Sequence, residues 1–428
     1  MKKSEYINRV PISKDNKCLY REEDKCTNCG ACKGICNFRI GVYGHYDMAK
    51  SPHPRCIYCG QCSLVCPNNC IKEFPDYKKI IADIKSGYTI ICQIAPATRF
   101  LVGDSFGYKP GKNVIGKIIS SLKKMGVTYV VDTSFGADLT IVEEANELIT
   151  RINNQEKLPM FTSCCPSWVE YLKLFYPKYQ KNLSTTKSPI LMCGSIIKNY
   201  LAPKNKLDKS KIKVVAIVPC TAKKYEITKT GDVDYAITVR ELCTWIKESK
   251  IDFRKMKPLR FDNLTGTSSG VIFGASGGVA EAMTRYLYHK LTYKSPPKKL
   301  LNFETLRGLD DIKEATIKIK DKEIRIAVVN GTGDIPRLFN QICQNDIKYD
   351  IIEVMACDGG CIAGGGGPKS FKITNTYKGL RSKAIYKKDK NVKRRNSYEN
   401  PQIKKLYKEL LSKPNSDKAI ELLHTKGE

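Results

Sequence analysis

The stretch from Ile351 to Pro368 reads IIEVMACDGGCIAGGGGP and joins an expected strand to a cysteine-bearing, glycine-rich loop. Four of its first five residues are apolar, which is typical of a strand buried on both faces. Cys357 and Cys361 then precede four consecutive glycines. Glycines permit tight turns and a close approach of the backbone to a bulky ligand. We expect an α/β fold with a ligand site beyond this strand.

From about residue 88 onward, apolar β-branched runs alternate with amphipathic stretches. The runs predict strands, and a hydrophobic period near 3.6 predicts helices. Their alternation is typical of an α/β fold with largely parallel sheets. Strands are expected at Tyr88–Ala95, Val127–Asp132, Val214–Val218, Ile324–Val329 and Ile351–Met355. Helices are expected at Lys112–Met125, Leu139–Asn153, Ser167–Phe175, Arg240–Lys247, Gly278–Lys290, Pro336–Asn345 and, near the end, Pro401–His424.

The segment Tyr377–Asn400 is polar and basic. It overlaps the densest basic stretch, Lys372–Arg395, which holds ten basic residues and one acid. Such a run is usually solvated. We therefore expect a surface excursion between the last strand and the terminal helical segment.

Two other motifs place cysteines where a strand is expected to end. Residues 162–168 read TSCCPSW, and residues 218–226 read VPCTAKKYE. Because loops at the carboxyl ends of parallel strands build one site, these motifs should converge with the glycine-rich loop. Together they supply four thiolates, the number that a 4Fe–4S cubane needs, and leave the neighbouring Cys164 unused. The four are Cys165, Cys220, Cys357 and Cys361.

The first eighty residues contain the spacing C-x2-C-x2-C-x3-C twice, 30 residues apart. Thiolates three apart on a turning backbone converge on one cubane, and the fourth reaches the other cluster from a short helix. Residues 1–80 are therefore expected to form a small domain stapled by two 4Fe–4S clusters. One cluster would be held by Cys26, Cys29, Cys32 and Cys66, and the other by Cys56, Cys59, Cys62 and Cys36. Two such clusters form a path for single electrons.

Composition limits the remaining possibilities. The 428 residues include 19 cysteines, and 42% are apolar, which excludes wholesale disorder. No apolar run is long enough for a membrane span, and the first residues lack the apolar core of a secretory signal. We therefore expect a soluble protein of the cytoplasm, in a reducing, anaerobic setting, whose cysteines bind metal rather than form disulfides.

The formal net charge of +30 leaves three interpretations open. It can be a solvated basic surface, a docking field for an acidic redox partner, or a nucleic-acid surface. No nucleic-acid-binding motif is visible, so we expect no nucleic-acid partner. Thiolate-ligated clusters also carry negative charge, which offsets part of the excess.

The three strand-end motifs, in this order, resemble the signature loops of the FeFe (iron-only) hydrogenases. The resemblance continues from the doubled cysteine motif to the last residues and covers nearly the whole chain. It implies two mainly parallel sheets flanked by helices over residues 88–428, preceded by a small α+β ferredoxin-like domain. It also implies the reaction 2H⁺ + 2e⁻ ⇌ H₂.

The cofactor that this resemblance implies is the H-cluster, a 4Fe–4S cubane joined through one cysteine sulfur to a two-iron unit. The two-iron unit carries CO, cyanide and a bridging dithiolate amine, and maturation proteins install it. Cys361 matches the bridging cysteine, and Lys223 matches a lysine that donates to a cyanide. The residues that match the pocket of the diiron unit are Met355, Pro96, Ala97 and Val218. Val218 is a departure, because the best-known members carry methionine there.

The resemblance also implies a proton path through the unligated cysteine. Glu144 lies 20 residues before Cys164, and Ser184 lies 20 residues after it, as in the family. Glu147 follows three residues after Glu144 and Arg151 four after Glu147, so all three share one face of the expected helix. Cys164 would exchange protons with the bridging amine as a general acid and base.

Three functions remain open for such a chain. The first is a catalytic hydrogenase that exchanges electrons with an acidic ferredoxin or flavodoxin. The second is a non-enzymatic relative, such as the eukaryotic iron–sulfur assembly factors, which lack the full active-site set. The third is a hydrogen sensor, although no appended sensory module is visible. Cys164, Lys223 and Glu226 favour the first.

Overall fold

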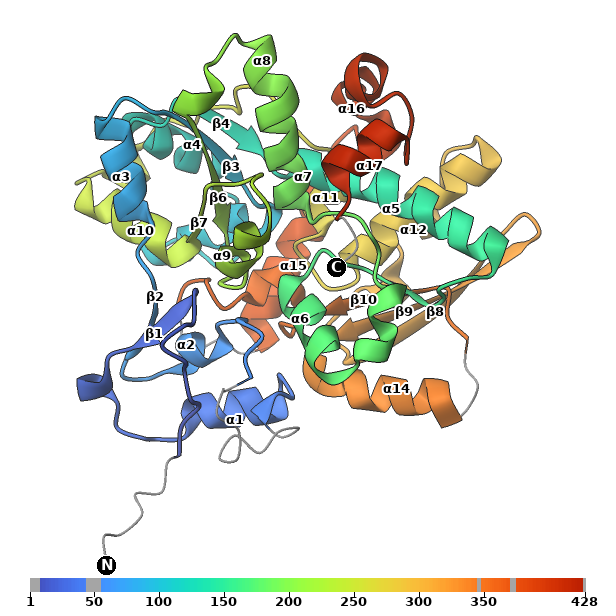
Figure 1. The fold of residues 1–428 in the computed structure, drawn as a ribbon, viewed down its shortest axis with the longest axis horizontal. Helices are drawn as coiled ribbons and strands as arrows, with labels where there is room; N and C mark the ends of the chain where they lie inside the picture. The colour runs from blue at the N-terminus through green and yellow to red at the C-terminus, as the bar shows by residue number, and fades with distance from the viewer. Residues whose placement is uncertain (1–7, 44–54, 345–347, 370–374, 426–428) are drawn as a thin grey trace, which may run out of the picture.

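The computed structural model describes residues 8–43, 55–344, 348–369 and 375–425. Its N-terminal part is drawn in blue at the lower left of Figure 1. There β1 (Leu19–Arg21) pairs antiparallel with β2 (Ile71–Glu73). Two short helices lie between these strands in sequence, α1 (Ala31–Phe38) and α2 (Gln61–Val65). Each begins after a glycine with positive φ, a backbone conformation that side chains disfavour.

The first sheet has four parallel strands in the order β4-β3-β6-β7. The central strands are almost wholly buried, which explains their continuous apolar runs. The alternation of strands and helices places this sheet correctly from sequence, except that β7 was not expected. The bounds are β3 (Thr89–Ile94), β4 (Tyr129–Asp132), β6 (Ile212–Val218) and β7 (Tyr235–Thr238).

The second sheet has the order β5-β10-β9-β8 and is mixed. The strands β5 (Met160–Phe161), β10 (Ile351–Met355) and β9 (Lys322–Asn330) run parallel. The edge strand β8 (Ile312–Ile319) forms an antiparallel hairpin with β9. The residues of β8 alternate between buried and exposed positions, so this strand has no continuous apolar run from which it could be predicted.

Helices cover both sheets, as an α/β fold requires. The long helix α5 (Ser134–Asn154) begins five residues before the expected start, and its first turn packs closely on α7 (Pro189–Ile196), where a Cβ atom on Gly136 would lie 2.1 Å from the Pro189 carbonyl oxygen. Five further helices were expected from the sequence: α4 (Ile115–Lys124), α6 (Pro166–Phe175), α10 (Val239–Glu248), α12 (Gly278–Thr292) and α14 (Ile335–Gln344). The expected last residue of α14, Asn345, lies outside the described residues. Other helices are α3 (Tyr77–Lys85), α7 (Pro189–Ile196), α8 (Ala202–Lys204), α9 (Lys223–Glu226), α11 (Ser268–Ile272) and α13 (Lys298–Leu301).

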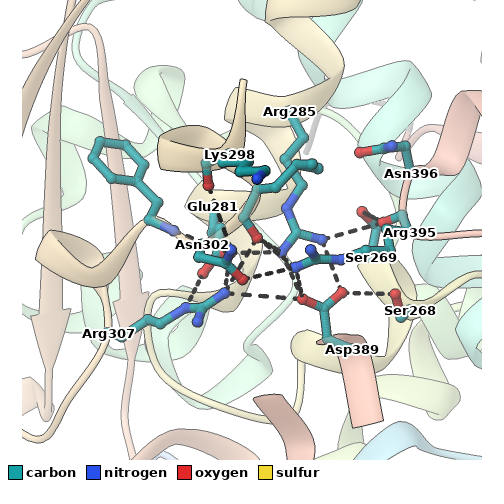
Figure 2. A network of polar contacts seen from close by, with 12 residues as sticks. Ser268, Ser269, Glu281, Arg285, Lys298, Asn302, Arg307, Asp389, Arg395 and Asn396 are labelled. Carbon is teal, nitrogen blue, oxygen red and sulfur yellow. Dashed lines mark hydrogen bonds and ion pairs between the residues drawn. The ribbon is translucent and has the colours of Figure 1, made fainter. Parts of the chain in front are cut away.

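The expected surface excursion at Tyr377–Asn400 is wrong. Most of it belongs to α15 (Asn375–Lys390), which lies in the middle of the molecule in Figure 1. Ile385 and Asp389 on this helix are fully buried, and Arg381 is almost so. The acid and the following Arg395 enter a network with α12, shown in Figure 2. The charges are buried because they compensate one another, which a local charge count does not reveal.

The C-terminal segment is helical, as expected. It comprises α16 (Pro401–Leu406), a π-helical turn at Tyr407–Leu411 and α17 (Asp417–Leu423). Among the described residues, no helix is both long and apolar enough to cross a membrane.

Candidate functional site

A large cavity lies where the carboxyl ends of the strands from both sheets meet. The loop after β3 contributes Pro96 and Ala97, and the end of β6 contributes Val218. The end of β10 contributes Met355. These four residues were all expected to line one pocket, and the structure brings them together. This is the position at which open α/β sheets build their ligand sites.

Five cysteine side chains line the same cavity, whose empty space, together with the solvent at its opening, amounts to about 790 Å³. Burial raises the pKa of each thiol, to about 12 for Cys220, Cys357 and Cys361. Neighbouring thiolates raise it further, so four bare thiolates here would be costly. A bound iron–sulfur cluster removes that cost, and the donor set fits one. The cysteines are Cys164, Cys165, Cys220, Cys357 and Cys361.

The glycine-rich loop leaves no room for side chains where it borders the cavity. A Cβ atom on Gly364 would lie 2.3 Å from the Pro219 carbonyl oxygen. One on Gly360 would lie 2.6 Å from the Ser276 nitrogen, and Gly360 also has a φ of +82°. The loop therefore needs glycine to bring the second and third motifs together.

Lys223 reaches the cavity from the first turn of α9. Its ammonium Nζ donates to both carboxylate oxygens of Glu226, at 2.9 and 2.8 Å, and to the Cys164 carbonyl oxygen at 3.1 Å. Ser188 donates to the same carboxylate at 2.9 Å. Burial lowers the pKa of Lys223, but the Glu226 carboxylate outweighs it and the net shift is upward. A charged donor is thus held at the cavity wall.

The residues of the expected proton path extend from the cavity toward the surface along α5. Ser184 Oγ donates to Glu147 Oε2 at 3.0 Å, and Arg151 Nη2 donates to Glu147 Oε1 at 2.6 Å. Glu144 lies one helical turn before Glu147 and is fully buried. In the described part of the chain, neither oxygen of its carboxyl has a hydrogen-bond partner.

The electrostatics of this group distinguish Glu144 from an ordinary acid. Burial, followed by the charge of Glu147, raises the pKa of Glu144 to about 8. Burial and Glu144 in turn raise the pKa of Cys164 well above its ordinary value. A buried carboxyl that titrates near neutrality is suited to proton exchange. The structure thus joins three of the expected residues, Ser184, Glu147 and Arg151, by hydrogen bonds, and leaves Glu144 one helical turn from Glu147 without such a bond.

Two smaller cavities lie in the N-terminal part. One encloses about 490 Å³ of unfilled space, and the other about 290 Å³. The larger is lined by Cys36, Cys56, Cys59 and Cys62, and the smaller by Cys26, Cys29, Cys32, Cys66 and Cys70. These contain the two groups of four that the spacing predicts, and their role as ligands stays a prediction. Among the described residues, no His, Cys, Asp or Glu side chains form a group that could hold a single metal ion.

Sequence reasoning missed several residues at these sites. Gln61 lies between two expected ligands, Cys59 and Cys62, but its side-chain amide reaches the large cavity's Cys357. Phe273 lines the large cavity from the residue after α11. No local pattern points to either contact, because each joins segments far apart in the chain. The position of Gln61 inside a cysteine motif was the one available signal.

Fold and cavities together place a cysteine-lined centre where two sheets meet, and its donor set is that of an iron–sulfur cluster site. The family described as iron only hydrogenase large subunit, C-terminal domain, matches residues 88–365. The family described as iron hydrogenase small subunit matches residues 375–427. The chain therefore belongs to the iron-only hydrogenase family, as its motifs predict.

Individual relatives agree with this assignment. The chain is 36% identical to the NADP-reducing hydrogenase subunit HndD of Solidesulfovibrio fructosivorans, over 95% of this chain and 74% of that protein. It is 41% identical to the periplasmic Fe hydrogenase large subunit of Nitratidesulfovibrio vulgaris, over 69% of this chain and 72% of that protein. A structure of the apo FeFe-hydrogenase from Chlamydomonas reinhardtii superposes with a TM-score of 0.71 at 31% identity, covering 82% of this chain and 98% of that one. Protein NAR1 of Arabidopsis thaliana is 28% identical over 86% of this chain and 84% of its own length.

Proposed function

We propose that this protein catalyses the reversible reduction of protons to dihydrogen, 2H⁺ + 2e⁻ ⇌ H₂. The observation that carries the proposal is the large cavity, where an unligated Cys164 and a charged Lys223 stand beside four further thiols. Ligation of a cubane alone needs the four thiols only. An additional proton donor and a buried cation indicate a site built for chemistry.

In this proposal the H-cluster is held by Cys165, Cys220, Cys357 and Cys361, with Cys361 as the bridging ligand. When bound, that cofactor supplies the metal centre at which protons and electrons combine. Lys223, paired with Glu226 at the cavity wall, would place a positive charge beside the negatively charged ligands of that cofactor. The apolar wall excludes water, and it consists of Met355, Val218, Pro96 and Ala97.

Protons reach the cavity through side chains along α5. Arg151 and Glu147 form the outer end of this proton path, where 12% of the Glu147 side chain is exposed to solvent. Ser184 hydrogen-bonds to Glu147 and leads inward to Glu144. Cys164 is the last protein side chain on this path before the cofactor, and it acts as the general acid and base.

Electrons pass through residues 1–80, which we propose form a separate ferredoxin-like domain with two 4Fe–4S clusters, ahead of a catalytic domain at 88–428. Cys29 is exposed, so the first cluster would face a surface partner. The partner we propose is an acidic ferredoxin or flavodoxin, because the chain carries a net charge of +30. The two-iron unit would be installed by maturation proteins, and the location we propose is the cytoplasm.

A second candidate function follows from the similarity to a cytosolic Fe–S cluster assembly factor of Danio rerio, which is 28% identical over 78% of this chain. Such a role needs the cubane ligands but not the proton path. The raised pKa of Glu144 and the placement of Lys223 favour catalysis instead.

Infrared spectroscopy with iron analysis tests the proposal. Chain produced with the maturation proteins should show CO and cyanide bands, evolve hydrogen and hold about 14 irons, from three cubanes and one diiron unit. Chain produced without them is the control and should hold about 12 irons, with neither bands nor activity. Matured chain that shows no bands and no turnover would favour the assembly role.

A further inference from the structure

The side-chain amide of Gln61 connects the N-terminal part directly to the large cavity. Gln61 is the first residue of α2, between Cys59 and Cys62. Its Nε2 atom lies 3.1 Å from Cys357 Sγ and 2.8 Å from the Ala363 carbonyl oxygen. One residue of the second cysteine motif thus touches both a predicted ligand of the large site and the turn that follows it.

The orientation of this amide is fixed by its neighbours. The Ala363 carbonyl can only accept a hydrogen bond, and a metal-bound cysteine sulfur can only accept one. An amide turned the other way would place its oxygen against both acceptors. The two N–H bonds of Gln61 therefore point one at each acceptor, and the side chain is almost fully buried.

The surrounding backbone brings the two cluster loops into contact at the same place. A Cβ atom on Gly365 would lie 2.1 Å from the Cys59 carbonyl oxygen, so only glycine fits. Cys59 and Cys357 are predicted ligands of different clusters, so this contact is where the N-terminal relay meets the catalytic centre.

We propose that Gln61 is a positioning residue that raises the reduction potential of the cubane held by Cys357. Reduction adds one negative charge to the cluster, and part of that charge resides on the cysteine sulfurs. An N–H dipole aimed at one sulfur stabilises the reduced form more than the oxidised form. Gln61 therefore makes electron transfer from the second cluster to this cubane more favourable.

The inference rests on the proposed cluster ligands but not on hydrogen turnover, so it can be tested in chain produced without maturation proteins. The test substitutes Gln61→Leu and Gln61→Met, which keep volume and remove both donors. The matched control is Thr221→Val. Thr221 Oγ1 donates to the Tyr58 carbonyl at 2.6 Å, so the control removes a hydrogen bond to the same loop without touching a sulfur.

The readout is a redox titration followed by electron paramagnetic resonance, using the signal that Cys357→Ala abolishes. We expect both Gln61 variants to make reduction of this cubane about tenfold less favourable, a fall of about 59 mV for a one-electron couple. Thr221→Val should leave the midpoint in place. An unchanged midpoint in both Gln61 variants would overturn the inference, as would an equal fall in the control. Loss of the cubane's iron in both variants would also overturn it, since Gln61 would then be a structural support. Failure of the hydrogenase proposal would appear separately, as missing turnover in matured chain with a normal midpoint.

Discussion

Arg285 and Asp389 form an ion pair with no solvent exposure, in which Arg285 Nη2 lies 2.9 Å from Asp389 Oδ2. The pair joins α12 of the part that matches the large-subunit family to α15 of the part that matches the small-subunit family. Ser268 and Arg395 also bind the Asp389 carboxylate, and Glu281 neutralises the other side of Arg285 (Figure 2). This network fixes α15, and on the same helix Arg381 donates to the Ile362 carbonyl beside Cys361.

Replacing Asp389 should therefore destabilise the fold. Asp389→Asn keeps the shape but leaves two nearby guanidinium groups short of their counter-charge. Breaking one partner of a buried pair costs about 3–5 kcal/mol. We expect a loss of that order in the free energy of unfolding, measured as a fall in the urea midpoint. Lys387→Gln, an exposed site on the same helix, is the control and should change stability by less than about 0.5 kcal/mol. Equal stability of the two variants would contradict a supporting role for the network.

The same helix shows where sequence reasoning fails. Asp389 and Arg381 look like members of a solvated basic run, because their partners Arg285 and Asp104 lie more than 100 residues away. Charge compensation across such separations leaves no local pattern. Strand β8 escaped prediction for a different reason, since an edge strand with one exposed face lacks a continuous apolar run.

The candidate site was more accessible to sequence reasoning. Strand ends could be located from buried apolar runs, and the sheet rule then predicted that the loops at Cys165, Cys220 and Cys357 meet. Side-chain contacts between loops were not accessible. Gln61 lies 296 residues before Cys357, and neither segment contains a pattern that predicts contact with the other.

Electron transfer with a protein partner should depend on salt. The chain carries a net charge of +30, and Arg9 and Arg21 line the cavity of the first predicted cluster. An acidic ferredoxin should be steered by this field, which salt screens beyond about 10 Å at 0.1 M. We expect its electron-transfer rate to fall severalfold as ionic strength rises. A cationic dye is the control and should gain little from the field. Rates with ferredoxin that stay flat across the salt series would leave the charge without a docking role.

The raised pKa of Glu144 gives a stability prediction with a definite sign. In the folded chain this carboxyl stays protonated up to about pH 8, whereas in the unfolded chain it ionises near its ordinary value of 4.5. Between these values the folded state binds the extra proton, so stability falls as pH rises. Glu144→Gln cannot ionise and removes this slope. Relative to the parent chain, the variant should gain about 1.4 kcal/mol of stability per pH unit in this window.

Thermal unfolding of both chains between pH 5.5 and 7.5 measures this difference. Other buried acids with a raised pKa that do not act on Glu144, such as Asp138, titrate in both chains and cancel in the comparison. The difference in unfolding temperature between variant and parent should therefore widen steadily with pH. A constant difference would mean that Glu144 is ionised throughout.

Cys164→Ser tests whether the unligated cysteine carries protons. Serine keeps the size and a hydrogen-bond donor, but its O–H is a much weaker acid than the S–H of cysteine in the same buried place, so it exchanges protons less readily. The four proposed ligands remain in place, so iron content and the CO and cyanide bands should be unchanged. Hydrogen turnover should fall by on the order of 10², the usual scale for losing a positioned acid or base. Glu144→Gln should show the same pattern, because it removes titration from the preceding group.

The matched control is Cys193→Ser. Cys193 is a buried thiol on α7 that is not among the residues lining the cavity, so this variant should keep turnover near that of the parent chain. Loss of iron in Cys164→Ser would make Cys164 a ligand and overturn the assignment of Cys165. Retention of both iron and full turnover would mean that protons enter by another route, and that the Glu147–Ser184 contact serves only to hold α5 against the segment that precedes α7.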